Sequence, residues 1–521
     1  MGKNILLKRL LTPLVLTALT ACTNLGPDYV APEAEWAAEW EPKFYDQLGP
    51  QKPSDQIDLD FWWKTFDDET LNELIAIAKN ENKTLQIAGL RILESQALLG
   101  IANSSTYPQV QTIDGSAAYS SSSIKGNGID TNVNGANYQA GFNIGWEIDF
   151  WGKYRRSIES ANASFLSTVA DHYDMQVLLS AQVAQVYYQY RTLQKRIHIA
   201  KENARIQERS FDISERKFKN GQDSELDLQQ AKTQLLSTLA AIPSLELSLF
   251  KTRNALSVLL SRPPGEITQI TGDLDNLPRI QPEDVSEIPA QYLIRRPDVR
   301  SAAYKVAAQT AQIGVAEAAK YPSLSLFGTL GWSGGSLAST QTIQTISGGP
   351  AISWNIFDYG RLENNVRVQD VRLQQLIESY HIEVLQAARE IDDSVLGIVK
   401  TYERQSILEQ TVEAANRALE LANFRYREGY ADFQRVLEAQ RTLYAQSEKE
   451  IINHGNHVLA IVELYKALGG GWSTVSADTM LPASTYKQLQ ERGDWDKLLI
   501  APIPLIIDQT NEQQTLPEES K

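Results

Sequence analysis

The sequence predicts a mixed α and β protein in which two internal repeats each combine a pair of membrane-type strands with very long helices. Three observations lead to this prediction: motifs return in the same order, two long stretches lack helix breakers, and short stretches alternate between apolar and polar residues. The 521 residues alone would suggest about three or four ordinary domains. That estimate assumes compact domains and does not hold for a chain of very long helices. The domain organisation is therefore inferred from the sequence motifs and their spacing.

Three pairs of matching motifs mark the repeat. The pairs are 107–110 with 321–324, 146–152 with 354–360, and 216–221 with 424–429. Gly152 and Gly221 are 69 positions apart, and so are Gly360 and Gly429. Equal spacing between matching motifs indicates an internal duplication.

Each repeat is expected to contain one very long helix. Residues 153–220 contain no glycine or proline, and residues 361–428 contain only Gly397. About 68 residues at 1.5 Å per residue make a rod of roughly 100 Å. Apolar or small residues recur at steps of three and four along the first rod, which is typical of a coiled-coil seam. This stripe consists of Phe165, Val169, Tyr173, Val177, Ala181, Ala184 and Tyr188.

Two shorter helices are expected to pair with the rods. They are predicted at about 224–261 and 431–468. Pro243 lies within the first of them, and we expect it to kink the helix because proline removes a main-chain hydrogen bond.

The strand signal is strongest from Tyr138 onward. Apolar residues occupy every second position there over about 11 residues, which is the length and period of a strand in a transmembrane barrel. Further strands are predicted at about 324–332 and 351–356. A fourth strand at about 109–119 alternates poorly and is assigned by the symmetry of the repeats.

The segments between paired strands are expected to be long external loops. Residues 120–136 and 333–348 are rich in Ser, Gly, Thr and Asn, which is typical of loops. Four strands cannot close a barrel, and an open sheet edge is not tolerated in hydrocarbon. Three chains would supply twelve strands, so the pattern predicts an oligomer.

The N-terminus predicts export and lipid attachment. Basic residues precede the apolar run 10–19, which is too short to span a bilayer and is typical of a signal peptide. The run closes with Leu19-Thr20-Ala21-Cys22, which resembles a bacterial lipobox, so Cys22 is expected to become the lipidated N-terminus. The alternative is an incidental cysteine in an ordinary signal peptide.

Composition excludes several classes of function. Cys22 is the only cysteine, which excludes an internal disulfide and a thiolate metal cluster. The net charge of −15 offers no broad basic surface, so we expect no nucleic-acid partner.

The chain resembles the TolC-like outer membrane factors, and among them the NodT-type efflux lipoproteins of RND-type pumps. An ordered set of motifs, which runs nearly from end to end, carries the resemblance. The set is LGPDY at 25–29, FWW at 61–63, FDD at 66–68, WEIDFWG at 146–152, RRPDVR at 295–300 and ALGGGW at 467–472. The tail after Ser473 departs from the family pattern.

The resemblance implies a homotrimer in which a twelve-stranded outer membrane β-barrel is continued by a periplasmic α-helical barrel with an equatorial mixed belt. It also implies a lipid-anchored protein of the cell outer membrane that extends into the periplasm. The segments expected are 1–21 (signal peptide), 22–67 (lipidated segment and belt), 68–261 (first repeat), 262–297 (proline-rich connector), 298–471 (second repeat) and 472–521 (belt and polar tail).

Two glycines end the rods. Gly221 and Gly429 stand where glycine commonly terminates a helix. The resemblance implies that these turns dock a periplasmic adaptor protein. The alternative is capping alone, and both roles can hold together.

Four residues just beside these turns match gate positions of the family. They are Asp227, Tyr426, Glu438 and Arg441. Three symmetry copies of each carboxylate would form a ring that favours cations, and pairing with Arg441 or its neighbours would hold the tunnel closed. The alternative is ordinary charge pairing on a helix surface.

Three motifs with other implications are set aside. Residues 331–335 fit the nucleophile-elbow pattern, but a Ser/Gly-rich segment follows them in place of a helix. Residues 130–135 open like a calcium loop, yet its twelfth position is Gly141. His454 and His457 form a lone pair at helical spacing, which is more often plain surface than a metal site. We therefore predict no enzymatic activity, no cofactor and no metal.

The function predicted is a passive exit duct for drugs, metals or other small molecules within a tripartite efflux system. The resemblance implies an inner-membrane transporter of the RND type, which would supply the energy through the adaptor. The alternatives are the outer membrane duct of a type I protein secretion system and a structural coiled-coil protein of the envelope. The four strands disfavour the last of these.

Overall fold

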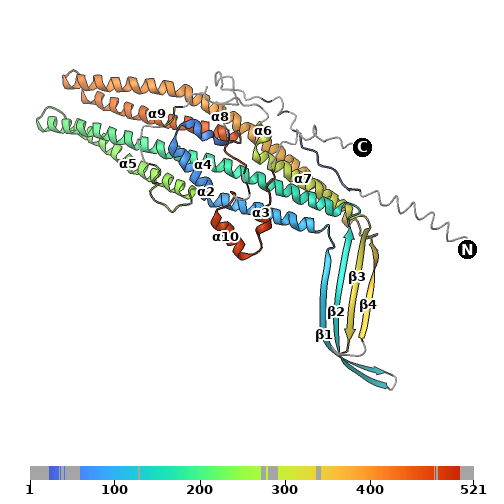
Figure 1. Cartoon of the computed structure of the whole chain (residues 1–521). Helices are drawn as coiled ribbons and strands as arrows, with labels where there is room; N and C mark the ends of the chain where they lie inside the picture. The colour runs from blue at the N-terminus through green and yellow to red at the C-terminus, as the bar shows by residue number, and fades with distance from the viewer. Residues whose placement is uncertain are drawn as a thin grey trace. The chain divides into compact units, whose positions relative to one another are not determined.

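The computed structural model shows the chain as two compact units (Figure 1). One unit comprises Met1–Glu33, Ile92–Thr168 and Ser301–Tyr380, and the other comprises Ala34–Arg91, Val169–Arg300 and His381–Lys521. The structure describes residues 23–33, 36, 40, 59–126, 129–270, 277–279, 292–335, 342–474, 476 and 479–504. Cys22 and the predicted signal peptide lie outside the described residues.

The helices of the two repeats agree in length. The rods are α4 (Lys153–Lys219) and α8 (Arg361–Arg427), each of 67 residues, which confirms the prediction of two very long helices. Their shorter companions are α5 (Glu225–Leu259) and α9 (Phe433–Ala467), each of 35 residues. In Figure 1, α5 runs beside α4 and α9 runs beside α8.

Two helices of 22 residues precede the strands of the repeats, α3 (Lys83–Ser104) and α7 (Pro297–Ala318). The other described helices are η4 (Leu59–Phe66), α2 (Glu69–Glu81), α6 (Tyr292–Arg295), α10 (Ala483–Arg492) and α11 (Asp496–Leu499). Pro243 lies inside α5 without ending it.

Side chains of the loops fix where several helices begin. Ser224 accepts a hydrogen bond from the Asp227 amide at the start of α5, and Asp432 accepts one from the Arg435 amide at the start of α9. These oxygens satisfy amides that have no partner within the helix. The two repeats therefore use the same kind of N-cap at the same place.

The strands form one antiparallel sheet in the order β1-β2-β3-β4. Their bounds are Val110–Gly126, Ile129–Ile148, Ser323–Gly334 and Thr342–Ser353. All four predicted strands exist, including β1, whose own alternation is weak. The repeats pair with each other through β2 and β3, so β1 and β4 are the edges of the sheet within one chain.

The prediction of two long loops is wrong, because the strands continue through most of those residues. The β1–β2 ladder runs on to the pair Gly126–Ile129, and β4 already begins at Thr342. Main-chain pairing sustains a strand where side chains are too small or too polar to show a pattern. The third predicted strand is also displaced, since β4 ends at Ser353, before Trp354 and Ile356.

The FWW and ALGGGW motifs meet in the core of the second unit. Trp62 is fully buried and stacks on Tyr465 with ring centroids 5.3 Å apart. The Gly471 amide donates to the carbonyl of Leu59 at 2.8 Å, and Gly471 has a positive φ of 101°. A glycine is required there because its backbone conformation would be strained for other residues.

Within the part of the chain that the structure describes, none of the helices has the length and apolar composition needed to cross a membrane.

Candidate functional site

The sheet has one apolar and one polar face. The row Ile113–Phe142–Leu330–Ile346 runs across all four strands, and all four side chains are exposed. The adjacent row, on the opposite face, is Thr112–Asn143–Thr329–Ser347. Directly paired residues lie on the same side of a sheet, so the predicted alternation is confirmed across strands as well as along them.

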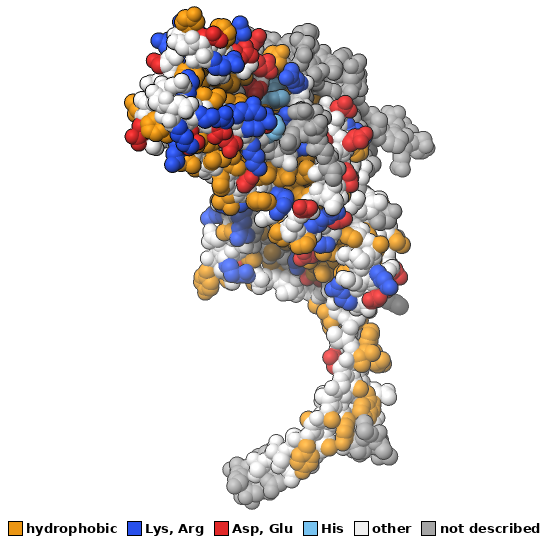
Figure 2. All heavy atoms as spheres, turned by 90° about the vertical axis from the view of Figure 1, so that its left-hand side faces the viewer, with side chains coloured by type: hydrophobic (Ala, Val, Ile, Leu, Met, Phe, Trp, Pro, Cys, Tyr) orange, Lys and Arg blue, Asp and Glu red, His pale blue; other side chains and the backbone are white. Residues whose placement is uncertain are grey.

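Hydrophobic side chains gather along the sheet in Figure 2, with few charged side chains among them. On the polar face, Asp114 accepts hydrogen bonds from Asn143 at 2.7 Å and from Thr112 at 3.0 Å. An exposed apolar face next to a hydrogen-bonded polar face is the arrangement of a sheet that separates lipid from water.

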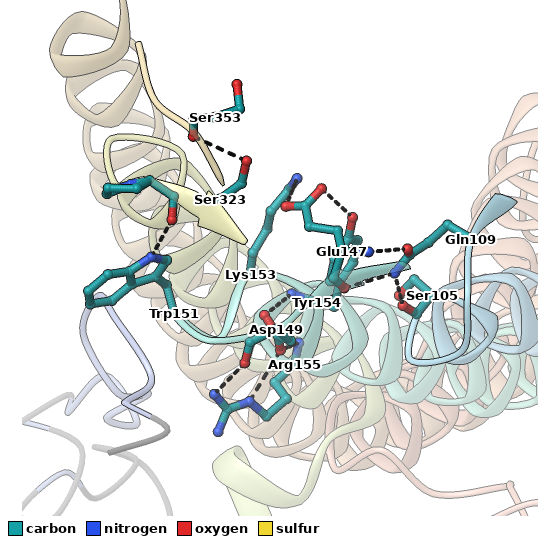
Figure 3. Close-up of polar contacts among 11 residues, drawn as sticks. Ser105, Gln109, Glu147, Asp149, Trp151, Lys153, Tyr154, Arg155, Ser323 and Ser353 are labelled. Carbon is teal, nitrogen blue, oxygen red and sulfur yellow. Dashed lines mark hydrogen bonds and ion pairs between the residues drawn. The ribbon is translucent and has the colours of Figure 1, made fainter. Parts of the chain in front are cut away.

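A polar cluster lies where the sheet joins the helices (Figure 3). Glu147 at the end of β2 accepts from Lys153 at 3.0 Å and from the Tyr154 hydroxyl at 2.9 Å. Asp149 accepts from the amides of Tyr154 and Arg155, which caps the start of α4. These contacts fix the direction in which the rod leaves the sheet.

A cavity of about 240 Å³ lies beside this cluster, lined by Glu147, Lys153, Tyr321, Ser323, Ser353 and other residues. Its two carboxylates, Glu147 and Asp149, already have hydrogen-bond partners. Among the described residues there is no cluster of His, Cys, Asp and Glu that could hold a metal ion.

The N-terminal segment is held against the same unit. Arg156 is almost fully buried, and its guanidinium donates to the carbonyl of Leu25 at 3.1 Å and to Asp28 at 2.7 Å. Gly26 has a positive φ, and a Cβ there would lie 2.5 Å from the Cα of Gly314. The close approach explains the glycine of the LGPDY motif.

Gly221 and Gly429 close the rods in the same way. Both have a positive φ, of 72° and 78°. The amides of Gly221 and Gln222 donate to the carbonyls of Phe218 and Lys217, the paired bonds of a Schellman motif. A Cβ at either glycine would meet no atom within 4 Å. Capping is thus established by the geometry, and the surface beyond the turns is open.

Tyr426 joins the two turns. Its hydroxyl donates to Asp223 at 2.7 Å, and its ring lies 5.1 Å from that of Phe433. The Lys217 ammonium lies 3.9 Å from the centre of the Tyr426 ring. Burial, the hydrogen bond to Asp223 and the charge of Asp227 together raise the pKa of Tyr426 well above its usual value. The phenol therefore stays protonated and remains a donor.

Two of the other predicted gate residues have hydrogen-bond partners of their own. Asp227 accepts from the Ser224 hydroxyl at 2.7 Å, and Arg441 donates to Gln234 at 2.7 Å. Glu438 is exposed on α9. Within one chain, then, the expected pairing of Arg441 with a carboxylate is replaced by a bond to an amide.

Sequence reasoning missed Asp223, Lys217 and Gln234. Asp223 could have been found from the sequence, because it is an acidic residue two positions after Gly221, within the turn that ends the first rod. Gln234 carried no signal, because its contact joins helices that only the fold brings together.

The motifs that were set aside lie within two strands and one helix. Residues 331–334 belong to β3, and residues 130–135 belong to β2. His454 interacts with the carbonyl of Pro278 at 3.1 Å, and His457 with the Thr401 hydroxyl at 2.9 Å. The two histidines thus have separate partners.

A comparison with protein families matches residues 74–262 and 288–470 to the outer membrane efflux protein family. The chain belongs to this family. The two matched ranges correspond to the two repeats. The chain is 30% identical over 481 residues to OpmQ, a pyoverdine export outer membrane protein of Pseudomonas putida, and the match covers 89% of this chain and 98% of that protein.

Another curated relative and a solved structure lead to the same family. The cation efflux system protein CusC of Escherichia coli is 29% identical over 470 residues, which cover 89% of this chain and 99% of CusC. The solved structure of the outer-membrane channel OprN has a TM-score of 0.76 at 32% identity, and the match covers 86% of this chain and 99% of OprN. The chain is accordingly an outer membrane channel component of a tripartite efflux system.

Of the functions considered from the sequence, the family match supports efflux in place of protein secretion or a structural role. The known members named here are channels or transport proteins.

Proposed function

We propose that this efflux protein works as a homotrimer whose twelve strands close an outer membrane barrel and whose rods form the periplasmic part of the duct. The observation that carries the proposal is the four-stranded sheet, with one apolar face and two edges, β1 and β4, within the chain. Unpaired amides and carbonyls at such edges cost several kcal/mol each in hydrocarbon. Pairing β4 of one copy with β1 of the next removes both edges.

Native mass measurement in mild detergent tests the stoichiometry, and single-channel recording in planar bilayers tests the duct. We expect three copies per particle and an ion conductance from those particles. A monodisperse monomer that still conducts would exclude this architecture.

The periplasmic end is proposed as the gate, with a revised set of residues. Asp223 and Tyr426 tie the two turns of one chain together, and the Lys217 ammonium lies over the ring of the same tyrosine. Asp227 and Glu438 would contribute to carboxylate rings in the trimer, and Arg441 would exchange Gln234 for a carboxylate of a neighbouring copy on closing. Threefold symmetry repeats each contact three times.

The two glycine turns are proposed to dock a periplasmic adaptor that links the duct to an inner-membrane transporter of the RND type. Their Cβ positions are open, so the turns present main chain as well as side chains. The last turns of the rods are basic, with Arg216, Lys217 and Lys219 on one and Arg425 and Arg427 on the other. An adaptor surface with acidic groups would complement them.

Cys22 is proposed to carry lipid. The first described residues are held by Arg156 and by the Leu25 amide, which donates to the carbonyl of Trp151 at 3.3 Å. These contacts tie the chain just after Cys22 to the unit that contains the sheet, so acyl chains on Cys22 would enter the membrane beside it. Two or more acyl chains give stable anchoring.

The cargo is proposed to be drugs, metals or other small molecules. The relatives are named for the export of pyoverdine and of cations, which differ widely in chemistry. A passive duct does not have to recognise its cargo, so selection belongs to the transporter. Efflux from cells that carry this channel with different inner-membrane partners tests this, because the substrate range should follow the partner.

A further inference from the structure

The two repeats correspond residue by residue at two fixed separations. Before the strands, Lys83 of α3 corresponds to Pro297 of α7, a separation of 214 positions. After the strands, Lys153 of α4 corresponds to Arg361 of α8, a separation of 208 positions. The difference arises in the strands, because the first hairpin is longer than the second.

Besides the pairing of β2 with β3, the repeats contact each other within the first unit between α4 and α7 and at the base of the sheet. On the helices, Gln312 of α7 donates to the Ser160 hydroxyl of α4 at 2.8 Å. At the base of the sheet, the rings of Trp151 and Tyr321 lie 4.8 Å apart. The Trp151 indole donates a hydrogen bond to the carbonyl of Pro322 at 2.7 Å (Figure 3). Both contacts join the later half of the first repeat to the earlier half of the second.

The matching positions on the other sides of the repeats are exposed. At the helix contact, Gln312 corresponds to Leu98, which is 56% exposed, and Ser160 corresponds to Val368, which is 45% exposed. A polar pair that is covered within the chain is thus matched by an apolar pair that faces solvent. Apolar side chains at matching helix positions on opposite sides of a protomer suit a contact between copies.

The sheet base shows the same relation with aromatic rings. Trp151 corresponds to Tyr359, which is fully exposed, and Tyr321 corresponds to Tyr107, which is 70% exposed. Tyr359 has a positive φ of 56°, a strained conformation for a residue with a side chain. An aromatic pair inside the chain is therefore matched by two unpaired aromatic residues outside it.

A glycine pair supports the same reading. Gly314 on α7 packs so closely on α4 that a Cβ would lie 2.7 Å from the Cγ of Arg156. Its counterpart Gly100 on α3 would have no atom within 4 Å of a Cβ. Gly100 would therefore allow another helix to approach α3 closely, although no atom of the same chain lies near its Cβ position.

We propose that a second copy of this chain covers this surface by repeating the internal contact, with Leu98 against Val368 and Tyr107 against Tyr359 of the neighbouring copy. This inference rests on the trimer proposed above and names the residues that join its copies. Such a contact is heterologous, head to tail, and closes into a ring when the rotation per chain is one third of a turn.

Cysteine cross-linking in the intact membrane-inserted protein tests the pairs. In Leu98→Cys/Val368→Cys and in Tyr107→Cys/Tyr359→Cys, a short bismaleimide should link chains into covalent dimers and trimers. The matched control is Trp151→Cys/Tyr321→Cys, whose link should stay within one chain. The four single variants and the wild type, which retains Cys22, set the background.

A charge exchange provides an independent test. Leu98→Asp and Val368→Arg should each lower the trimer fraction severalfold, and the double variant should restore it, because the opposite charges meet only across the interface. A loss of trimer in the double variant equal to the sum of the single losses would contradict the pairing.

The outcomes separate this inference from the trimer itself. Three copies by native mass with no inter-chain link at either pair would overturn the interface and leave the trimer standing. A monomeric wild type would overturn the trimer as well. Trimers that persist in both single charge variants, together with a loss of adaptor co-purification, would assign the surface to the adaptor.

Discussion

Tyr426 offers a direct test of the gate proposed above. It is the donor that connects the end of the second rod to the turn of the first repeat. Tyr426→Phe keeps the ring against Phe433 and removes that hydrogen bond, which is worth about 1 kcal/mol per chain. Over three chains the change becomes about 3 kcal/mol, or on the order of a hundredfold in a concerted open–closed equilibrium.

We therefore expect Tyr426→Phe to raise the open probability of the purified trimer in single-channel recordings. Tyr402→Phe is the control, because Tyr402 is an exposed tyrosine on the same helix. Equal open probabilities in the wild type and both variants would remove Tyr426 from the gate.

Asp174 on α4 is a second residue with a measurable consequence. Burial, assisted by Asp298, Asp171 and Glu383, raises its pKa to about 7, while Arg296 opposes the shift. The folded protein then binds a proton that the unfolded chain has already released between pH 4 and pH 7. The contribution of Asp174 to stability is present below about pH 4 and is lost as the pH rises through about 7.

Asp174→Asn should remove this dependence. We expect the variant to match the wild type near pH 4 and to be more stable at pH 8, by at most about 4 kcal/mol. Unfolding midpoints of both proteins at several pH values provide the comparison. A stability difference that does not change with pH would show that Asp174 titrates normally.

At the scale of elements, the turns at the ends of the rods have two separable tasks. Gly221→Val should lower stability by about 1–2 kcal/mol, because a β-branched residue is strained in the left-handed conformation. Gly221→Asn should cost less, since asparagine tolerates that conformation. A Cβ at position 221 would meet no atom within 4 Å, so the two variants should differ in stability only through the strain of the left-handed backbone conformation.

Adaptor binding by the same pair of variants distinguishes capping from docking. If Gly221 acts only as a cap, affinity for the adaptor should fall with the loss of stability and recover in the asparagine variant. If the exposed main chain is itself the docking surface, both variants should bind weakly. Affinity that is unchanged in both would exclude the first turn as a docking site.

The charged residues of α5 and α9 form the second element-scale test. Arg441→Ala and Asp227→Ala should raise conductance or open probability, with folding and trimer yield unchanged, if the closed gate depends on them. The loss of the Asp227 carboxylates should also reduce cation preference, because three clustered charges raise the local cation concentration. Gln234→Ala, which frees Arg441 from its bond within the chain, should leave the closed state intact or strengthen it.

At the scale of the whole molecule, the lipid anchor proposed at Cys22 can be tested directly. Mass spectrometry of the native protein should show residues 1–21 removed and acyl chains on Cys22. Cys22→Ala should weaken attachment while the barrel still inserts, because strand pairing does not involve the anchor. An intact Met1, or a free thiol at Cys22, would contradict lipidation.

The sequence by itself determined the repeats, the rods and the existence of all four strands. These features follow from local rules: a run without glycine or proline, an alternation of period two and a glycine at a helix end. The family and its function also came from the sequence, because short motifs such as RRPDVR survive in order along the chain. Gly221 and Gly429 were predicted to end the rods by the same local rules, which their positive φ confirms, whereas Tyr426 was predicted only from its match to a gate position of the family.

Only the tertiary structure decided how far the strands extend and which residues meet. The Ser- and Gly-rich residues 120–126 carry no strand pattern, and their pairing with 129–135 is a property of two segments together. The contacts of Tyr426 with Asp223 and of Arg441 with Gln234 join residues about 200 positions apart. Such contacts depend on the packing of helices against each other, which local patterns do not encode.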